Sequence, residues 1–294
     1  MLEALSLAGR RVLVTGGTEG IGRAVVDAAV ARGAEVWVVA RNAERLATRV
    51  ADWERAAPVE ELPGVDQVHG IELDVRELCS AAGRERLRAA LPGEGLDIVV
   101  ANAGTNVRKP AVDYTDDEVD HVLETNQRAA FALAQVVHPF LVAAAERRTA
   151  TRDSRPKDPE NTNASGPVRT AATVVPASAL VFVLSVAGHA HLPTGAPYGM
   201  SKAALTQLVR NLAVEWAPSV RVNAVSPWYT DTPLAREVLS DPEYRSRVTT
   251  ATPLGRVAAA SEVAEPILFL ASEAASFITG QTLPVDGGFL ARGF

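Results

Sequence analysis

The chain has 294 residues, of which 47% are hydrophobic and 22% are charged, and it carries a net charge of −6 at pH 7. The length is enough for one large α/β domain with a sizeable core. The negative charge argues against a nucleic-acid partner, because phosphate binding requires a basic face. No apolar run approaches the roughly 20 residues of a membrane helix, so no membrane association is expected.

Short apolar runs alternate with longer amphipathic stretches along the whole chain. The runs are rich in Val, Ile and Leu, as in strands covered on both faces, and they span 11–15, 34–40, 68–74, 96–101, 179–184, 220–225 and 282–286. Helical patterns lie between them, at 21–32, 42–56, 76–90, 116–147, 199–217, 233–248 and 261–272. This order predicts an α/β fold with a doubly wound parallel seven-stranded sheet and helices on both faces (Rossmann), in a single domain over 1–294.

The expected cellular location follows from the first strand and from cysteine usage. The first strand begins by Val12, which leaves no room for a signal peptide. Cys79 is the only cysteine, so an internal disulfide is excluded and a reducing compartment is the simpler expectation. We therefore expect a cytoplasmic protein.

Residues 148–178 interrupt the alternation, because they are polar, rich in Pro, Thr and Ser, and without helical or strand period. A structureless loop of this length is unusual inside a compact domain. It joins a helix to the next strand, so it should lie at the amino ends of the strands, whereas ligands of such sheets bind beyond the carboxyl ends. We expect a polar surface insertion; an active-site lid and a partner-binding segment are the alternatives.

A glycine-rich loop, Thr15-Gly16-Gly17-Thr18-Glu19-Gly20-Ile21-Gly22, connects the first strand to the first helix. Glycines at these positions let the backbone turn tightly, approach a pyrophosphate and pack close to the sheet. The helix N-terminus adds free N–H groups and a partial positive charge. This context predicts a dinucleotide site, to which the loop contributes Thr15, Gly16, Thr18, Gly20, Ile21 and Gly22.

The end of the second strand bears on the choice between NADP and NAD. An acid there would bind the ribose 2′-hydroxyl, whereas a cation accommodates a 2′-phosphate. Ala40 stands where the acid would be, and Arg41 follows with a fork that suits a phosphate. Glu19 in the glycine loop opposes this. We predict NADP, with NAD as the alternative.

Two further strand ends should contribute to the cofactor site. Asp74 ends the third strand and is followed by Val75, and the Asp74 carboxylate is placed to hold an adenine amino group. Asn102, Ala103 and Gly104 end the fourth strand. Both groups fall on the ligand side of the sheet.

A serine, a tyrosine and a lysine make up the expected chemical centre. Ser185 ends a strand, and Tyr198 and Lys202 follow at a spacing of four, which places both on one helix face. A free tyrosine has a pKa near 10, and an ammonium group close by would lower it. Tyr198 would then protonate a developing alkoxide, or deprotonate an alcohol, while Ser185 hydrogen-bonds the same oxygen.

These residues together resemble the short-chain dehydrogenase/reductase family, over essentially the full length except 148–178. The glycine loop, Asn102-Ala103-Gly104 and the Ser185, Tyr198 and Lys202 set match its motifs. The resemblance implies hydride transfer between a nicotinamide and a ketone or secondary alcohol. It also implies that Lys202 holds the nicotinamide ribose, that Asn126 supports a relay water through a helix kink, and that Pro227 and Thr232 contact the cofactor.

Within this family the chain is similar to the tropinone-reductase-like branch. Pro227-Trp228 replaces the usual Pro-Gly, and the closing Val285-Asp286-Gly287-Gly288-Phe289 fits that branch. The branch usually has Lys or Arg where Glu19 stands, which weakens the inherited preference for NADP. The family also implies a homodimer or homotetramer formed through the helix at 116–147 and the helix that carries Tyr198.

The substrate pocket should be walled by the stretch 189–194 and by residues after the sixth strand, namely His189, Trp228, Tyr229, Leu234, Val238 and Leu239. Such a wall suggests a hydrophobic or cyclic ketone, a small-molecule carbonyl or alcohol substrate. Two nearby histidines without further ligands do not make a metal site, so no metal is expected.

Two other functions remain open at this stage. One is a cofactor-binding sensor or scaffold without turnover, which would have no need of Tyr198, Lys202, Ser185 and Asn126 together. The other is epimerisation or dehydration on the same scaffold, which would regenerate the cofactor instead of consuming it.

Overall fold

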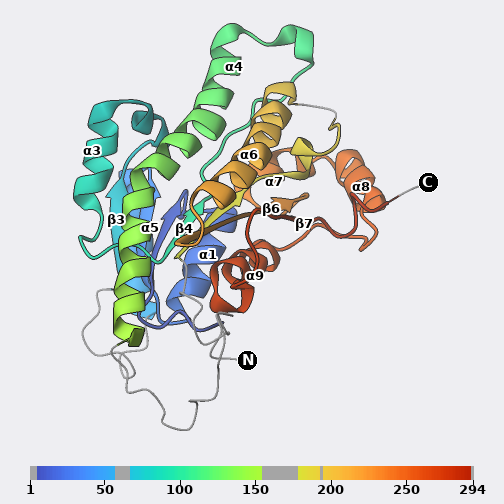
Figure 1. The fold of residues 1–294 in the computed structure, drawn as a ribbon. Coiled ribbons are helices and arrows are strands. Elements are labelled where there is room, and N and C mark those ends of the chain that lie inside the picture. The colour runs from blue at the N-terminus through green and yellow to red at the C-terminus, as the bar shows by residue number, and fades with distance from the viewer. Residues whose placement is uncertain (1–4, 57–66, 154–177, 193–194, 293–294) are drawn as a thin grey trace.

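The structure, a computed structural model, describes residues 5–56, 67–153, 178–192 and 195–292. Seven parallel strands form one sheet in the order β3-β2-β1-β4-β5-β6-β7 (Figure 1). All seven predicted strands and the parallel doubly wound topology are confirmed. The strands are β1 (Arg11–Thr15), β2 (Glu35–Ala40), β3 (Val68–Glu72), β4 (Ile98–Ala101), β5 (Ser178–Val183), β6 (Val220–Pro227) and β7 (Thr282–Val285).

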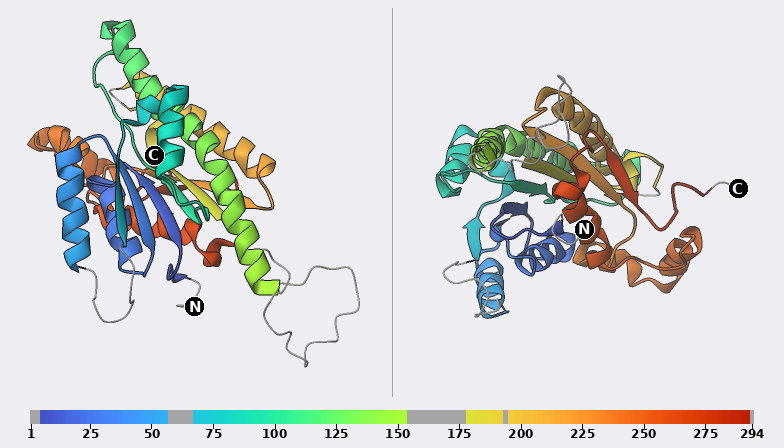
Figure 2. Two further views of the ribbon diagram at one scale, coloured as in Figure 1. Left: turned by 90° about the vertical axis from the view of Figure 1, so that its left-hand side faces the viewer. Right: turned by 60° about the horizontal axis from the view of Figure 1, so that its bottom comes forward.

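Two hydrophobic cores lie on opposite faces of the sheet, because successive strand residues point to opposite sides. Leu13 belongs to one core, while its neighbours Val12 and Val14 belong to the other. The first core is covered by α3 (Ala81–Ala90), α5 (Ala129–Asp153) and α6 (Ala196–Glu215), and the second by α1 (Gly20–Val30), α2 (Ala43–Ala56) and α9 (Ala260–Ala271). Figure 2 shows the helices on both sides of the sheet.

The helix predicted over 116–147 differs from the prediction in two ways. It is divided into α4 (Asp116–Leu123) and α5 by a π-helical turn, Glu124–Arg128, and it continues to Asp153, so the prediction of irregular structure over 148–153 is wrong. The reason lies in tertiary ion pairs: Arg147 and Arg148 approach the buried Asp97 carboxylate at 3.1 and 3.4 Å. Ser178 is already part of β5, and the rest of the predicted insertion lies outside the described residues.

Capping residues divide two other predicted helices. The range 76–90 contains a 3-10 helix, Val75–Cys79, followed by α3, whose N-cap Ser80 accepts a hydrogen bond from the Gly83 N–H. The range 233–248 contains α7 (Pro233–Leu239) and α8 (Pro242–Ala251), with Asp241 as the N-cap of α8. Pro242 stands at the first position of α8, where proline is favoured because the N–H group it lacks would have no partner within the helix.

One continuous helical stretch, Asp116–Thr151, is long and apolar enough by length and composition to cross a membrane. The core helix of a globular protein passes the same test. Here half of the most apolar window is buried, and Leu133, Val136, Val137 and Leu141 belong to the first core. Packing against the sheet therefore accounts for the apolar side of this helix.

Candidate active site

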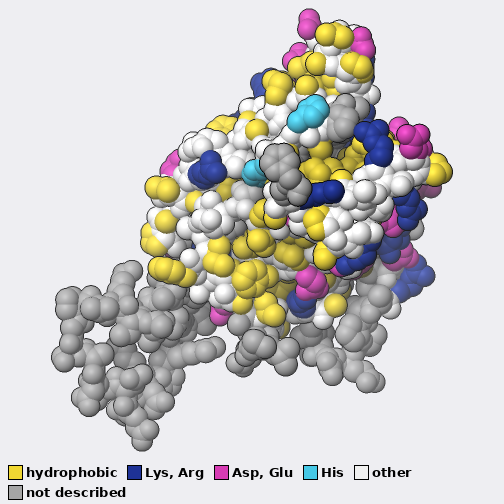
Figure 3. Space-filling view, turned by 90° about the vertical axis from the view of Figure 1, so that its right-hand side faces the viewer, with side chains coloured by type: hydrophobic (Ala, Val, Ile, Leu, Met, Phe, Trp, Pro, Cys, Tyr) yellow, Lys and Arg dark blue, Asp and Glu magenta, His cyan; other side chains and the backbone are white. Residues whose placement is uncertain are grey.

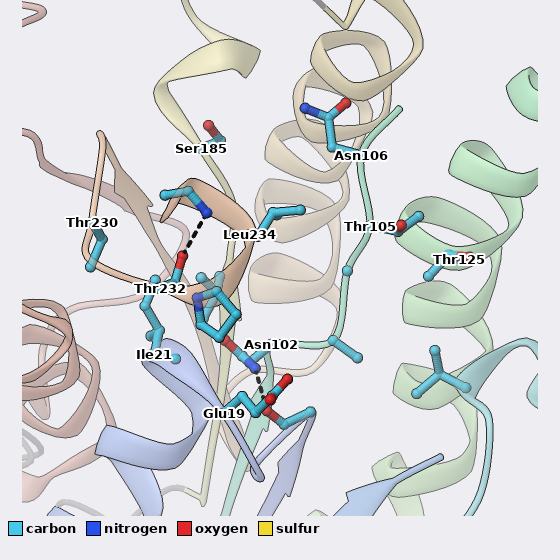
Figure 4. A pocket seen from close by; sticks show the side chains of 18 of the residues that line it. Glu19, Ile21, Asn102, Thr105, Asn106, Thr125, Ser185, Thr230, Thr232 and Leu234 are labelled. Atoms are coloured by element: carbon cyan, nitrogen blue, oxygen red, sulfur yellow. Dashed lines mark hydrogen bonds between the residues drawn. The ribbon is translucent and has the colours of Figure 1, made fainter. Parts of the chain in front are cut away.

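A cavity of about 380 Å³ lies along the carboxyl ends of the strands, a volume within the range of ligand and cofactor sites. Figure 4 shows Glu19 and Ile21 near one end of it and Ser185 and Asn106 near the other. The sequence-predicted residues on its wall are Gly16, Thr18, Gly20, Ile21, Arg41, Asp74, Val75, Asn102, Ala103, Gly104, Ser185, Tyr198, Lys202, Pro227, Trp228, Tyr229 and Thr232.

The glycine loop has the shape of a phosphate cradle. Gly16 and Gly20 adopt positive φ values of 68° and 55°, which side-chain-bearing residues rarely adopt. A Cβ atom at Gly22 would lie 2.2 Å from the Gly16 carbonyl oxygen, so only glycine permits this packing. The N-terminus of α1 has no side-chain cap, since Glu19 makes no such hydrogen bond. No side chain therefore caps this turn, and its Gly20 and Ile21 line the cavity, as expected for an anion site at a helix N-terminus.

Thr15 and Gly22, which the sequence predicted as cofactor residues, do not line the cavity and support the cradle from behind it. Thr15 is buried, and its hydroxyl oxygen accepts hydrogen bonds of 3.1 Å from the N–H groups of Asn102 and Ala103. Asn102 in turn donates from its side-chain amide to the carbonyls of Thr15 (2.9 Å) and Gly16 (3.1 Å). The loops after β1 and β4 are therefore fixed to each other.

Acidic and basic side chains are paired at the glycine-loop end of the cavity. Arg45 approaches the Glu19 carboxylate at 2.6 Å, so the acid that opposed NADP in the sequence is neutralised by a residue that sequence reasoning missed. Arg41 is exposed on the cavity wall, and no carboxylate of the described residues forms an ion pair with it. Arg41 is thus left as a cation for an anionic group.

The Asp74 carboxylate is bound by the neighbouring Arg76, although the sequence predicted that it would hold an adenine amino group. Its carboxylate accepts hydrogen bonds from the Arg76 guanidinium, at 2.8 Å for Nη2, and from the Arg76 backbone N–H at 2.9 Å. The hydrogen bonds to Arg76 lower the pKa of Asp74, and the nearby charge of Arg41 adds to this. The carboxylate is therefore ionised and caps the 3-10 helix that follows β3.

Ser185, Tyr198 and Lys202 converge on the opposite end of the cavity. Ser185 lies two residues after the end of β5, and Tyr198 lies in the first turn of α6 because this helix begins three residues earlier than predicted. Lys202 is buried, and its Nζ donates a 2.8 Å hydrogen bond to the Val183 carbonyl. The same Nζ lies 5.6 Å from the centroid of the Tyr198 ring.

The electrostatics of this pair differ from the expectation. Burial raises the pKa of Tyr198, opposed by the Ser185 hydroxyl and by the charge of Arg108, so the predicted lowering of this pKa by Lys202 is not found. The physical reason is that the lysine amine is directed at the Val183 carbonyl. Burial also lowers the pKa of Lys202 from its ordinary 10.5 to about 8.

Asn126 lies in the π-helical turn, which supplies the helix kink that the family resemblance implied. Its side-chain oxygen accepts from the Thr105 N–H at 2.8 Å, and its amide donates to the Thr105 carbonyl and to the Ser201 hydroxyl. Ser201 donates onward to the Tyr198 carbonyl at 2.7 Å. Asn126 lines a smaller cavity shared with Lys202 and does not line the main one.

Trp228 and Tyr229 line the cavity, as predicted for the substrate pocket, whereas His189 does not. The His189 ring lies 3.0 Å from the Ser226 hydroxyl and is absent from the cavity wall. Trp228 is held by stacking on Phe289 and by donating to the Thr252 hydroxyl. Leu234 lines the cavity, whereas Val238 and Leu239 pack behind it.

Sequence reasoning missed Arg108 and Asn106, which line the same end from the loop after β4. Their signal was their place directly after Asn102-Ala103-Gly104, at a strand end on the ligand side. On the face shown in Figure 3, hydrophobic side chains lie beside Lys and Arg side chains around a hollow. Among the described residues, no group of three His, Cys, Asp or Glu is arranged to hold a metal ion.

Fold and cavity together define a Rossmann-type oxidoreductase, and comparison with known proteins specifies the family. The short chain dehydrogenase family matches residues 10–151, and the Enoyl-(Acyl carrier protein) reductase family matches residues 158–290. A tropinone reductase homolog of Arabidopsis thaliana is 39% identical over 297 residues, covering 98% of this chain and 95% of the relative. Senescence-associated protein 13 of the same plant is 36% identical, with 98% and 93% covered.

Solved structures agree with this over nearly the whole chain. A gluconate 5-dehydrogenase from Burkholderia cenocepacia, in complex with NADP and tartrate, has a TM-score of 0.80 at 26% identity, with 99% of each chain covered. The RhlG/NADP complex from Pseudomonas aeruginosa has a TM-score of 0.79 at 31% identity, with 98% of this chain and 99% of that one covered. The chain belongs to the short-chain dehydrogenase/reductase family and is an oxidoreductase similar to the tropinone reductase homologs.

Proposed function

We propose that this enzyme reduces a ketone to a secondary alcohol, or catalyses the reverse oxidation, with NADP(H) as the hydride carrier and Tyr198 as the acid and base. The observation that carries the proposal is the convergence of Tyr198, Ser185 and Lys202 at one end of a cavity whose other end is a glycine-rich anion cradle. A bound nicotinamide would supply or accept the hydride. The residues of the protein then have to transfer one proton and stabilise the negative charge that develops on the substrate oxygen.

The residues present fit that division of work. The Tyr198 hydroxyl would give its proton to the alkoxide oxygen formed from the ketone, and Ser185 would hydrogen-bond the same oxygen. The raised pKa of Tyr198 keeps the phenol protonated, which suits the reducing direction. Lys202 would hold the ribose hydroxyls of the cofactor, and the network from Asn126 through Ser201 would fix the first turn of α6.

The preference for NADP rests on charge at the other end. Arg41 has a fork that matches a phosphate, and Glu19 is neutralised by Arg45. The two solved relatives described above carry NADP in their complexes. NAD remains the alternative cofactor, and the cytoplasmic location and the homo-oligomer remain predictions.

The direct test is Tyr198→Phe, assayed by NADPH consumption with a panel of ketones. Removing the proton donor should lower kcat by about 10²- to 10⁴-fold while NADPH binding, followed by fluorescence, is retained. Tyr114→Phe is the matched control, because Tyr114 lies off the cavity wall and donates to the Val107 carbonyl. Unchanged turnover in Tyr198→Phe rejects the role proposed for this residue.

A further inference from the structure

Arg108 stands on the cavity wall at the reaction end. It lies in the loop after β4, and its Nη1 is 3.4 Å from the carbonyl oxygen of Leu234 in the first turn of α7. Burial raises the pKa of both Tyr198 and Tyr229, and the charge of Arg108 opposes this rise at each of them. The guanidinium therefore acts on the two tyrosines that line this end of the cavity.

No carboxylate of the described residues forms an ion pair with Arg108. The acids on the cavity wall, Glu19 and Asp74, pair with Arg45 and Arg76 instead. The neighbouring cation behaves differently: Lys109 lies off the wall and approaches Glu118 at 2.5 Å. Among the described residues the Arg108 guanidinium makes one hydrogen bond, to the Leu234 carbonyl, so its other N–H groups can bind an anionic group of a bound ligand.

The chemistry of the guanidinium indicates which anion fits. Its planar fork matches a carboxylate with two parallel hydrogen bonds. One charge suits a monoanion, and the cofactor's phosphates have their own cradle and Arg41 at the opposite end. The remaining wall, with Leu192, Trp228 and Leu234, suits a carbon skeleton.

We infer that the substrate is a ketone carrying one carboxylate, or the corresponding hydroxy acid in the oxidising direction, and that Arg108 binds this carboxylate. The inference rests on the proposed function and names the substrate class for it. The sequence predicted a hydrophobic or cyclic ketone as the substrate. The inference narrows this class to ketones whose skeleton is apolar and whose one end is anionic.

Matched pairs of keto acids and their methyl esters test this: 4-oxopentanoate, 4-oxocyclohexanecarboxylate and 4-acetylbenzoate. In the wild type we expect kcat/KM for the preferred acid to exceed that of its ester by about 10-fold or more, and Arg108→Gln to lower it about 10- to 100-fold. The ester should change less than about 3-fold, which separates loss of the carboxylate contact from an effect on Tyr198 acidity.

Two variants complete the design. Arg108→Lys keeps the charge without the fork and should fall between wild type and Arg108→Gln. Lys109→Gln removes the neighbouring charge and should leave the acid-to-ester ratio unchanged. Equal or better use of the esters by the wild type overturns the inference while the proposed ketone reductase stands. If no acid or ester consumes NADPH or NADH while neutral ketones of the panel do, the inference fails and the proposed function stands; if the panel is not reduced either, both fail.

Discussion

The two ends of the cavity differ in how their charges are balanced. At the glycine-loop end, Glu19 and Asp74 are each paired with an arginine, at 2.6 and 2.8 Å, and Arg41 forms no ion pair within the part of the chain that the structure describes. At the reaction end, Lys202 and Arg108 face the cavity without a carboxylate partner among the described residues. Ion pairs hold their side chains in place before a ligand binds. An unpaired cation, in contrast, gains its counter-charge only from a bound ligand.

This difference suggests that the two ends do different work. The glycine-loop end is held by backbone geometry and ion pairs, so its contribution to binding should be shared among many groups. The reaction end depends on single side chains, and burial makes the charged form of one of them, Lys202, unfavourable. Replacing one of those side chains should affect activity most, and should affect stability least or even favourably.

Lys202 provides the largest expected effect. Lys202→Met should lower kcat/KM by about 100-fold or more, because the ammonium group proposed to hold the cofactor ribose is lost. Stability should behave oppositely. Lowering the pKa of Lys202 from 10.5 to about 8 corresponds to an unfavourable contribution of about 3 kcal/mol below pH 8 in the wild type. Lys202→Met removes this unfavourable contribution and should raise the free energy of unfolding. The variant also loses the hydrogen bond to the Val183 carbonyl, which offsets about 1 kcal/mol of that increase.

The sign of the pH dependence distinguishes this explanation from simple repacking. Between pH 8 and 10 the unfolded chain keeps the proton of Lys202 while the folded protein has lost it, so wild-type stability rises with pH relative to the variant. Urea unfolding at pH 7, 8 and 9.5 should show the advantage of Lys202→Met shrinking along this series. If the difference in the free energy of unfolding between variant and wild type stays constant with pH, burial does not disfavour the charged form of Lys202.

Arg41 provides the next effect, at the other end of the cavity. Arg41→Ala should lower kcat/KM with NADPH by about 10- to 100-fold, the loss of charge-assisted hydrogen bonds to a phosphate, and change that with NADH less than about 3-fold. Arg45→Ala is the comparison, because it exposes the Glu19 carboxylate and should also disfavour NADPH. If Arg41→Ala weakens both cofactors equally, the 2′-phosphate is not its ligand and the NADP preference lacks its basis.

How far the sequence anticipated this molecule depends on the range over which each signal acts. The glycine loop could be predicted, because Gly16 and Gly20 take up positive φ values in a local turn between one strand and the next helix. The spacing of Tyr198 and Lys202 placed both on one helix face. Both signals act over a few residues, as do the short apolar runs that predicted the seven strands.

Long-range contacts could not be predicted in the same way. The pairing of Arg45 with Glu19 joins α2 to the glycine loop, and the ion pairs of Arg147 and Arg148 with buried Asp97 extend α5 into a polar segment. His189 turned to Ser226 instead of the cavity for the same reason. Each depends on a partner far along the chain, which local pattern does not reveal.

Asp74 provides the smallest effect and tests whether the paired end is mainly structural. Asp74→Asn removes the ion pair with Arg76 and weakens the cap of the following 3-10 helix. Since this pair is partly exposed, about 1 kcal/mol of stability should be lost at pH 7. The lowered folded pKa of Asp74 means that the wild type has this stability above its ordinary pKa of 3.8 and loses it as pH falls further.

The same variant should lower kcat/KM with NADPH and NADH by equal factors of about 2 to 5, because an adenine contact does not distinguish the two cofactors. Unfolding curves at pH 7 and pH 3 give the stability part, and the difference between wild type and variant should shrink at pH 3. A selective loss of NADPH would instead mean that Asp74 orients Arg41 through their mutual attraction. The glycine-loop end would then depend on a single cation, as the reaction end does, and the contrast between paired and unpaired charge would no longer separate them.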